Sequence, residues 1–192
     1  MNFLAHTYLS GNNPDIIFGN FIGDMIKGTK YKIYSENIIK GILLHRKIDS
    51  YTDSHPTVKK SIYRLRPAYG KYAGVATDIL YDHYLSQDWN KYSDEKLETY
   101  VERIHSVILE NYRKLPRKSR RFAVSFIKKK RLLCYKDLKC FRDVLNKMSV
   151  YTSLPYKTAH AMQIISENYD SFKEEFNTFF PDIINYLDNN IK

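Results

Sequence analysis

The feature that most constrains the fold is an apolar helical stripe that ends in ionisable residues. Ile38, Ile42, His45 and Asp49 follow one another at spacings of four, three and four residues. Residues at these spacings lie on one face of an α-helix. The stripe begins apolar, as a core-facing stripe does, and becomes ionisable over its last two turns. The segment therefore predicts a helix that directs a histidine and an aspartate toward the interior of the fold.

The segment around residues 75–89 repeats this pattern. Asp78 and Asp82 lie on one stripe between Val75 and Leu85, at spacings of three, four and three residues, and His83 follows directly. A helix through this segment turns two carboxylates toward an otherwise apolar face. The alternative for this pair on its own is an ordinary acid pair on a solvated surface.

A third stripe lies near the N-terminus. Ile17, Asn20 and Asp24 follow one another at spacings of three and four residues, and His6 comes three residues after Phe3. A single histidine in such a position is more often a hydrogen-bonded core residue than a metal ligand, so the argument depends on the combination.

Seven ionisable residues thus lie on predicted apolar stripes: His6, Asp24, His45, Asp49, Asp78, Asp82 and His83. Burying several carboxylates without partners is costly, and the cost disappears if they converge on a divalent cation. Imidazole nitrogen with carboxylate oxygens suits manganese, iron or zinc, and carboxylate-rich sites also hold magnesium. The combination predicts a metal site, with pairing of Asp49 or Asp53 to Arg46 or Lys47 as the structural alternative.

The fold class that the sequence predicts is all-α. No stretch alternates with a period of two for long enough to indicate a strand. We expect one domain over residues 1–192, a helical bundle with its metal-site helices in about 1–90 and its basic and C-terminal helices in about 113–192. The expected helices span about 14–27, 35–52, 57–66, 70–89, 93–112, 118–132, 136–148, 156–169 and 170–190, the last kinked or broken near Pro181.

The formal net charge of +10 comes from one segment. Residues 113–131 hold ten bases and no acid, and the rest of the chain balances, with 21 bases against 21 acids. So localised a positive field suggests a polyanionic partner, namely nucleic acid, anionic lipid or an acidic protein, and a solvated helix face is the alternative. The residues that we expect to bind this partner are Arg117, Lys118, Arg120, Arg121, Lys128, Lys129 and Lys130.

The expected compartment is the cytoplasm. The first 15 residues lack the basic and apolar regions of a signal peptide, and no apolar run approaches the roughly 20 residues that span a bilayer. Cys134 and Cys140 lack the spacing of a zinc site, and we expect them as reduced thiols.

Four motifs resemble those of the acyl carrier protein phosphodiesterases. They are NFLAH at 2–6, GNFIGDMIKG at 19–28, HRKIDSYTD at 45–53 and DILYDHYLSQDW at 78–89, in the family's order and near its spacings. A fainter likeness continues into YKDLKCFRDVLNKMS at 135–149. After its MS dipeptide, where the family often has a basic residue, this chain has Val150 and Tyr151.

The resemblance implies an HD-like fold, since the family is a divergent, all-helical relative of the HD-type metal phosphohydrolases. Its members hydrolyse the phosphodiester that joins 4′-phosphopantetheine to a serine of holo-acyl carrier protein. The implied cofactor is a divalent metal, Mn²⁺ first, with Mg²⁺ and Fe²⁺ as alternatives. The implied partner is the small, acidic carrier protein.

The stripes and the resemblance together suggest which residues bind the metal. We expect Asp24, His45, Asp78 and Asp82 to form its inner shell, because they come from three different helices, as a site in a bundle core requires. The adjacent Asp82 and His83 reverse the His–Asp order that names the HD enzymes.

Five further residues have expected catalytic roles. Asp49 and His6 would orient ligands or move protons, and His83 would protonate the serine alkoxide, which is a poor leaving group without a proton. Arg46 and Lys27 would hold the phosphate, Arg46 through two hydrogen bonds, with surface ion pairs as the alternative.

Two other functions fit the same sequence. One is an HD-like phosphohydrolase that acts on a nucleotide or signalling phosphodiester. The other is a helical protein without enzymatic activity that binds nucleic acid through the basic segment, where aromatic residues are interleaved with bases. The position of the basic segment relative to the metal site would discriminate between these functions.

Overall fold

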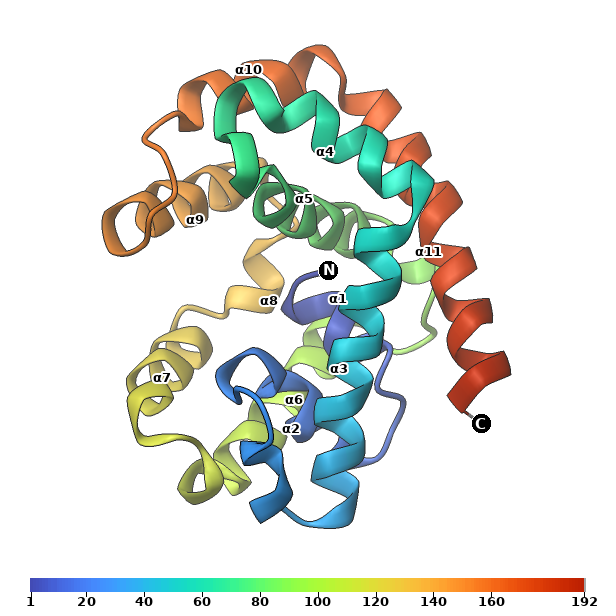
Figure 1. The fold of residues 1–192 in the computed structure, drawn as a ribbon, viewed down its shortest axis with the longest axis vertical. Coiled ribbons are helices and arrows are strands. Elements are labelled where there is room, and N and C mark those ends of the chain that lie inside the picture. The colour runs from blue at the N-terminus through green and yellow to red at the C-terminus, as the bar shows by residue number, and fades with distance from the viewer. Residues whose placement is uncertain (192) are drawn as a thin grey trace. The chain divides into compact units, whose positions relative to one another are not determined.

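The computed structural model describes residues 1–191, and throughout that range the chain forms helices and no strand, which confirms the all-α class (Figure 1). The α-helices are α1 (Phe3–Tyr8), α2 (Pro14–Phe21), α3 (Glu36–Ser54), α4 (Pro56–Tyr69), α5 (Ala73–Gln87), α6 (Leu97–Glu110), α7 (Arg120–Lys128), α8 (Arg131–Cys134), α9 (Leu138–Tyr151), α10 (Thr158–Glu167) and α11 (Tyr169–Ile191). Short 3₁₀ turns join several of them, including η1 (Gly23–Met25). None of the described helices is both long and apolar enough to cross a membrane.

The chain divides into two compact units that interleave in sequence. Unit 1 comprises Met1–Asn2, Ser50–Tyr84 and the chain from Tyr135 onward, and unit 2 comprises Phe3–Asp49 and Leu85–Cys134. The expectation of a single domain is not tested by this division and stays a prediction.

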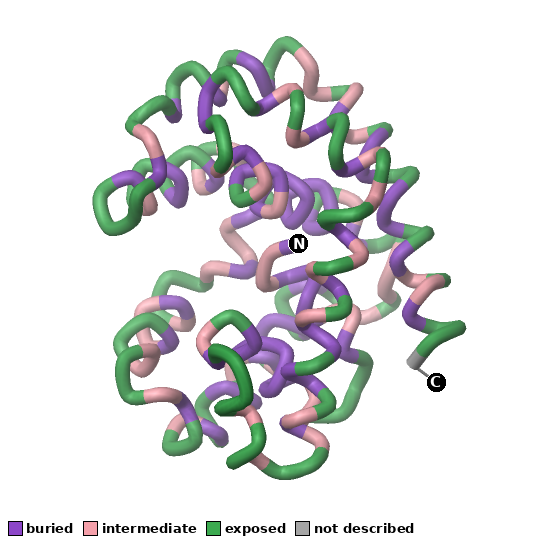
Figure 2. Tube along the Cα trace, viewed as in Figure 1, coloured by how far each residue is buried: buried purple, intermediate pink, exposed green. Residues whose placement is uncertain are grey.

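Unit 1 is built around the long helix α11. Helix α4 packs against both α10 and α11 (Figure 1). The side chains of Phe172, Phe176, Phe179 and Ile183 are fully buried at spacings of four, three and four residues, which gives α11 one continuous apolar face (Figure 2). Aromatic burial along this face therefore holds unit 1 together.

The expected break at Pro181 is wrong. Helix α11 continues through Pro181 from Tyr169 to Ile191. A proline removes one backbone donor from the helical hydrogen bonds, but Pro181 lies on the exposed face of α11, where water can satisfy the carbonyl group left without a partner. The apolar face described above continues on both sides of Pro181, and a kink at this position stays a prediction.

Unit 2 depends on a close crossing of α2 and α3. A Cβ atom at Gly19 would overlap the carbonyl oxygen of Ile38, and one at Gly41 would overlap that of Ile16. The two helices therefore meet backbone against backbone, and only glycine fits at the crossing. Asn13 accepts hydrogen bonds from the amides of residues 15 and 16 and caps α2, as the Asn–Pro pair in the sequence indicates.

An aromatic cluster joins the basic segment to the N-terminal helices of unit 2. The ring of Phe3 lies 5.4 Å from that of Phe21, 5.5 Å from that of Phe122 and 5.0 Å from that of Phe126. Phe126 is buried, so it belongs to the core, whereas Phe122 is partly exposed. Helix α7 is thus packed against α1, which carries His6 one turn beyond Phe3.

The single basic helix expected over residues 118–132 is wrong. Helix α7 ends at Lys128 and α8 begins at Arg131. Between them Lys130 has a φ angle of 44°, in the left-handed region that a right-handed helix cannot include. The reduced cysteines expected from the sequence are also wrong, because Cys134 and Cys140 are both disulfide-bonded.

Candidate metal centre

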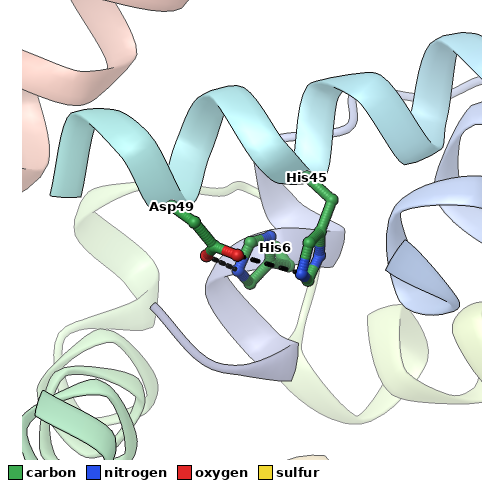
Figure 3. A group of neighbouring side chains, drawn as sticks. All are labelled: His6, His45 and Asp49. Carbon is green, nitrogen blue, oxygen red and sulfur yellow. Dashed lines mark hydrogen bonds and ion pairs between the residues drawn. The ribbon is translucent and has the colours of Figure 1, made fainter. Parts of the chain in front are cut away.

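Three side chains of unit 2 converge on one point. His6 comes from α1, and His45 and Asp49 come from successive turns of α3 (Figure 3). Nε2 of His6 lies 3.1 Å from Oδ1 of Asp49, and Nε2 of His45 lies 3.1 Å from Oδ2 of Asp49. Each of the three residues offers one ligand atom, and these atoms lie within 4.8 Å of one another, so the group could hold a metal ion.

Asp24 adds a second carboxylate to this group. Its Oδ1 lies 3.3 Å from Nε2 of His45, and its side chain is 75% exposed. The expectation that Asp24 continues the stripe of a helix reaching Lys27 is wrong, because α2 ends at Phe21 and the turn η1 carries Asp24. A Cβ atom at Gly23 would overlap the His45 ring, so this turn fits under the imidazole only with glycine there.

The two imidazoles stack face to face, and both present Nδ1 to the same amide oxygen. Their ring centroids are 4.0 Å apart with an interplanar angle of 20°. Nδ1 of His6 lies 2.9 Å and Nδ1 of His45 lies 3.1 Å from Oδ1 of Asn20, which is fully buried. Both rings therefore have an oxygen at Nδ1 and a carboxylate oxygen at Nε2.

The electrostatics of the two rings differ. Burial lowers the pKa of His6 to about 4, despite the opposing effect of Asp49. Burial acts in the same direction on His45, but Asp24 and Asp49 outweigh it and raise the pKa of His45 to about 9. In turn, the two histidines hold the pKa of Asp49 well below its usual range, although burial of the carboxyl opposes them.

This arrangement fits a divalent cation. A neutral His6 has one N–H, yet oxygen atoms face both of its ring nitrogens. Within residues 1–191, Nε2 of His45 is buried and has no hydrogen-bond partner of acceptable geometry, although two carboxylates lie at ion-pair distance. A cation between the two Nε2 atoms and the carboxylates would satisfy all of these groups.

The other three metal-site candidates lie on α5, within unit 1. Asp82 is fully buried, and Asp78 lies 2.9 Å from the amino group of Met1. His83 is buried, with Nδ1 2.8 Å from the carbonyl oxygen of Tyr135 and Nε2 2.9 Å from the hydroxyl of Tyr169. The carbonyl oxygen can only accept, so Nδ1 carries the hydrogen and Nε2 of neutral His83 accepts from the Tyr169 hydroxyl. A role as general acid would require a second proton, on Nε2, and stays a prediction, as do the ligand roles of Asp78 and Asp82.

The two candidate phosphate-binding residues are far apart in sequence, but Arg46 contacts the loop that carries Lys27. Arg46 donates from Nη2 to the carbonyl oxygens of Ile26 and Gly28, at 3.2 and 2.8 Å. These bonds anchor the loop that follows η1 and therefore help to place Asp24. Lys27 lies on this loop and is exposed. Phosphate binding by either residue stays a prediction.

The basic residues differ in their exposure. The exposed ones are Arg117, Lys118, Arg121, Lys128, Lys129 and Lys130. Arg120 instead donates to the carbonyl oxygen of Arg113 at 2.8 Å and lies over the ring of Tyr112. Arg120 therefore holds the turn before α7, and the exposed bases are the better candidates for partner binding.

Sequence analysis missed what Asn20 and the glycines do. The sequence places Asn20 on an apolar stripe, and a buried amide between two ionisable positions is itself a signal that it bonds to one of them. Gly19, Gly23 and Gly41 carry no such signal, because a glycine shows its function only when the atoms next to it are known.

Comparison with known proteins gave consistent matches. A family model described as acyl carrier protein phosphodiesterase matches residues 1–183. The acyl carrier protein phosphodiesterase of Pectobacterium atrosepticum is 30% identical, with 94% of each chain covered. The enzyme of the same name from Photorhabdus laumondii is 28% identical, with 98% of this chain and 96% of its own covered. No solved structure gives a significant match.

The histidine pair predicts a pH dependence of stability that a metal should reverse. Without metal, the raised pKa of His45 stabilises the fold fully below pH about 6.5, and this contribution is lost as the pH rises toward about 9. With excess Mn²⁺, the gain in stability should instead grow over that pH range, because the metal competes with the proton for Nε2. Urea unfolding in EDTA and in Mn²⁺ at several pH values measures both slopes.

His45→Gln should abolish both the loss of stability with rising pH in EDTA and the gain in Mn²⁺. His55→Gln should preserve both slopes, since His55 pairs with Asp182 in unit 1. His6 acts outside this range, because its lowered pKa costs stability only as the pH falls from about 6.5 toward about 4. The same pH slope with and without Mn²⁺ would contradict metal binding at His45.

Proposed function

Because the chain belongs to the acyl carrier protein phosphodiesterase family, we propose that it removes 4′-phosphopantetheine from the serine of holo-acyl carrier protein by metal-dependent hydrolysis of the phosphodiester. The family match over residues 1–183 confirms the resemblance of the four sequence motifs. The observation that supports metal-dependent hydrolysis is that the ligand atoms of His6, His45 and Asp49 lie close together within unit 2. The products would be apo-carrier protein and free phosphopantetheine.

The geometry supports a ligand set slightly different from the one expected from the sequence. We assign His6, His45 and Asp49 to the metal, with Asp24 as a further carboxylate at its exposed side. Two imidazole nitrogens with carboxylate oxygens suit Mn²⁺ or Fe²⁺ better than Mg²⁺, which prefers oxygen ligands alone. A bound ion of this kind polarises a phosphate oxygen and lowers the pKa of a water.

The residues of the chain have separable tasks in this proposal. Asp49 faces both imidazoles through its two oxygens and so fixes their relative position. Arg46 secures the loop that presents Asp24 and Lys27. The exposed amino group of Lys27 is then available to a phosphate, which it would hold by charge. His83 remains the candidate that protonates the serine oxygen as it leaves.

We also propose that the fold is HD-like. The support is the all-helical architecture together with a cluster of two buried histidines and a half-exposed aspartate on two helices. The cytoplasm stays the proposed compartment, since the acidic carrier protein that serves fatty acid synthesis would be met there. The cysteines no longer support this compartment, because both are disulfide-bonded.

The position of the basic helix favours a protein substrate. Phe122 and Phe126 of α7 pack on Phe3, one helical turn from His6, so the exposed bases of α7 share unit 2 with the metal cluster. A strongly acidic carrier protein would be steered toward such a surface. Nucleic acid would be attracted by the same charge, but it would not require the cluster of histidine and aspartate.

Mass spectrometry of holo-acyl carrier protein incubated with this protein and Mn²⁺ tests the function. We expect loss of the phosphopantetheine mass, and no loss in EDTA. Asp49→Asn should reduce the rate at least about 100-fold, because the amide keeps the shape but loses the charge that the metal and both histidines require. Asp53→Asn, an exposed change one turn further along α3, is the matched control and should retain activity.

An unchanged holo mass with folded, metal-loaded protein would exclude the carrier protein as substrate. Cleavage of a nucleotide phosphodiester by the same preparation would then favour the rival phosphohydrolase function.

The basic segment, residues 113–131, predicts that the rate with holo-carrier protein depends strongly on salt concentration. Arg117→Glu with Arg121→Glu should lower kcat/KM for holo-carrier protein about 10-fold or more at low salt, because steering of the acidic substrate is reversed. The rate with bis(p-nitrophenyl) phosphate, a small substrate, should stay unchanged.

The control for this prediction is the double variant Lys59→Glu with Lys60→Glu, which changes two exposed bases on α4 in unit 1. It alters the net charge equally. Equal losses in the two double variants would show that net charge, and not the exposed bases of residues 117–130, attracts the substrate.

A further inference from the structure

The buried side chain of Asn20 has a hydrogen-bond network that fixes its orientation. Its Nδ2 lies 2.9 Å from the carbonyl oxygen of His6 and 2.8 Å from Oγ of Ser10. A carbonyl oxygen can only accept, so the atom that faces it is the amide nitrogen. Ser10 donates to the same carbonyl oxygen at 2.8 Å, which leaves its own oxygen to accept from Asn20. The three groups form a closed network with no ambiguity in the amide.

The other end of the amide faces the two histidines. With its nitrogen committed, Oδ1 of Asn20 can only accept a hydrogen bond, and it faces Nδ1 of both rings at 2.9 and 3.1 Å. Both contacts are satisfied only if each Nδ1 carries the hydrogen. Each neutral ring then has its lone pair on Nε2, the nitrogen that faces Asp49.

We propose that Asn20 is a positioning residue that holds His6 and His45 in the same tautomer, so that both Nε2 lone pairs point at the metal. One acceptor oxygen thereby fixes the tautomer of two histidines that come from two different helices. This inference rests on the proposed metal site and adds a residue that acts through the ligands and touches neither metal nor substrate. Groups that orient metal-binding histidines in this way commonly change metal affinity about 10- to 100-fold when they are lost.

The position of Asn20 explains how one oxygen reaches both rings. Asn20 directly follows Gly19, at the crossing where α2 touches α3 backbone against backbone. The close approach brings α2 near enough to α3 for a short side chain to contact His45, while the amide also reaches the carbonyl oxygen of His6 on α1. A longer side chain would not fit, because residue 20 is fully buried.

The direct test is long-range ¹H–¹⁵N NMR of the histidine rings. In the Zn²⁺-loaded protein we expect a hydrogen on Nδ1 and zinc on Nε2 for both His6 and His45. In the metal-free protein at pH 7.5 we expect neutral His6 to show the same Nδ1–H tautomer. Zinc on Nδ1 of either ring, or an Nε2–H tautomer of metal-free His6, would overturn the proposal.

Metal affinity of three variants provides the second readout, by competition with a fluorescent chelator for Zn²⁺. Asn20→Leu removes the acceptor and should weaken binding about 10- to 100-fold. Asn20→Asp keeps an acceptor oxygen at both rings but loses the donor that faces the His6 carbonyl oxygen, so it should bind more tightly than Asn20→Leu and more weakly than the wild type. Ser10→Ala removes a partner of the amide nitrogen without touching the acceptor and should bind within a few-fold of the wild type. Equal affinity of Asn20→Leu and wild type would contradict the proposal.

The outcomes separate this inference from the proposed function. If the wild type binds no divalent ion, the metal site fails, and the metal-free spectrum of His6 still tests the tautomer. If both tautomers and affinities follow expectation but holo-carrier protein stays intact, the proposed substrate fails and the role of Asn20 stands. If Asn20→Leu does not fold, the wild-type spectra and Asn20→Asp decide.

Discussion

Two buried imidazoles, stacked with their ring centroids 4.0 Å apart and bounded by oxygen at every ring nitrogen, are the constraint on which unit 2 depends. Protonation alone cannot give every ring nitrogen a hydrogen to donate to its oxygen. Two neighbouring imidazolium rings repel each other, and a neutral ring has only one hydrogen to donate. One cation shared with Asp49 satisfies both rings. The same atoms would therefore form a binding site for a divalent cation.

The rest of unit 2 supports that arrangement. Glycines at positions 19 and 41 let α2 and α3 touch, and Gly23 lets a 3₁₀ turn pass under the His45 ring with Asp24 beside it. The aromatic cluster around Phe3 then fixes α7 to the helix that carries His6. The candidate metal-binding residues and the basic segment are thereby held together by one set of contacts within unit 2.

The sequence predicted the helices and the ionisable stripes because both depend on local periodicity. His45 and Asp49 follow apolar Ile38 and Ile42 on one face of α3, and the structure buries His45 as expected but leaves Asp49 half-exposed. The sequence failed where tertiary contacts decide. Helix α2 ends six residues early because the turn at Gly23 fits under the His45 ring, and α11 passes Pro181 because its apolar face is continuous. The role of Asn20 required knowledge of what lies at both ends of its amide.

The central claim is that the imidazoles of His6 and His45 bind one divalent metal through nitrogen. Electron spin echo envelope modulation of the protein loaded with one equivalent of Mn²⁺ measures this directly, because it detects nitrogen bonded to the ion. We predict coupling to two imidazole nitrogens, reduced to one in His6→Gln and in His45→Gln, and unchanged in His55→Gln. A Mn²⁺ signal without nitrogen coupling would contradict the account.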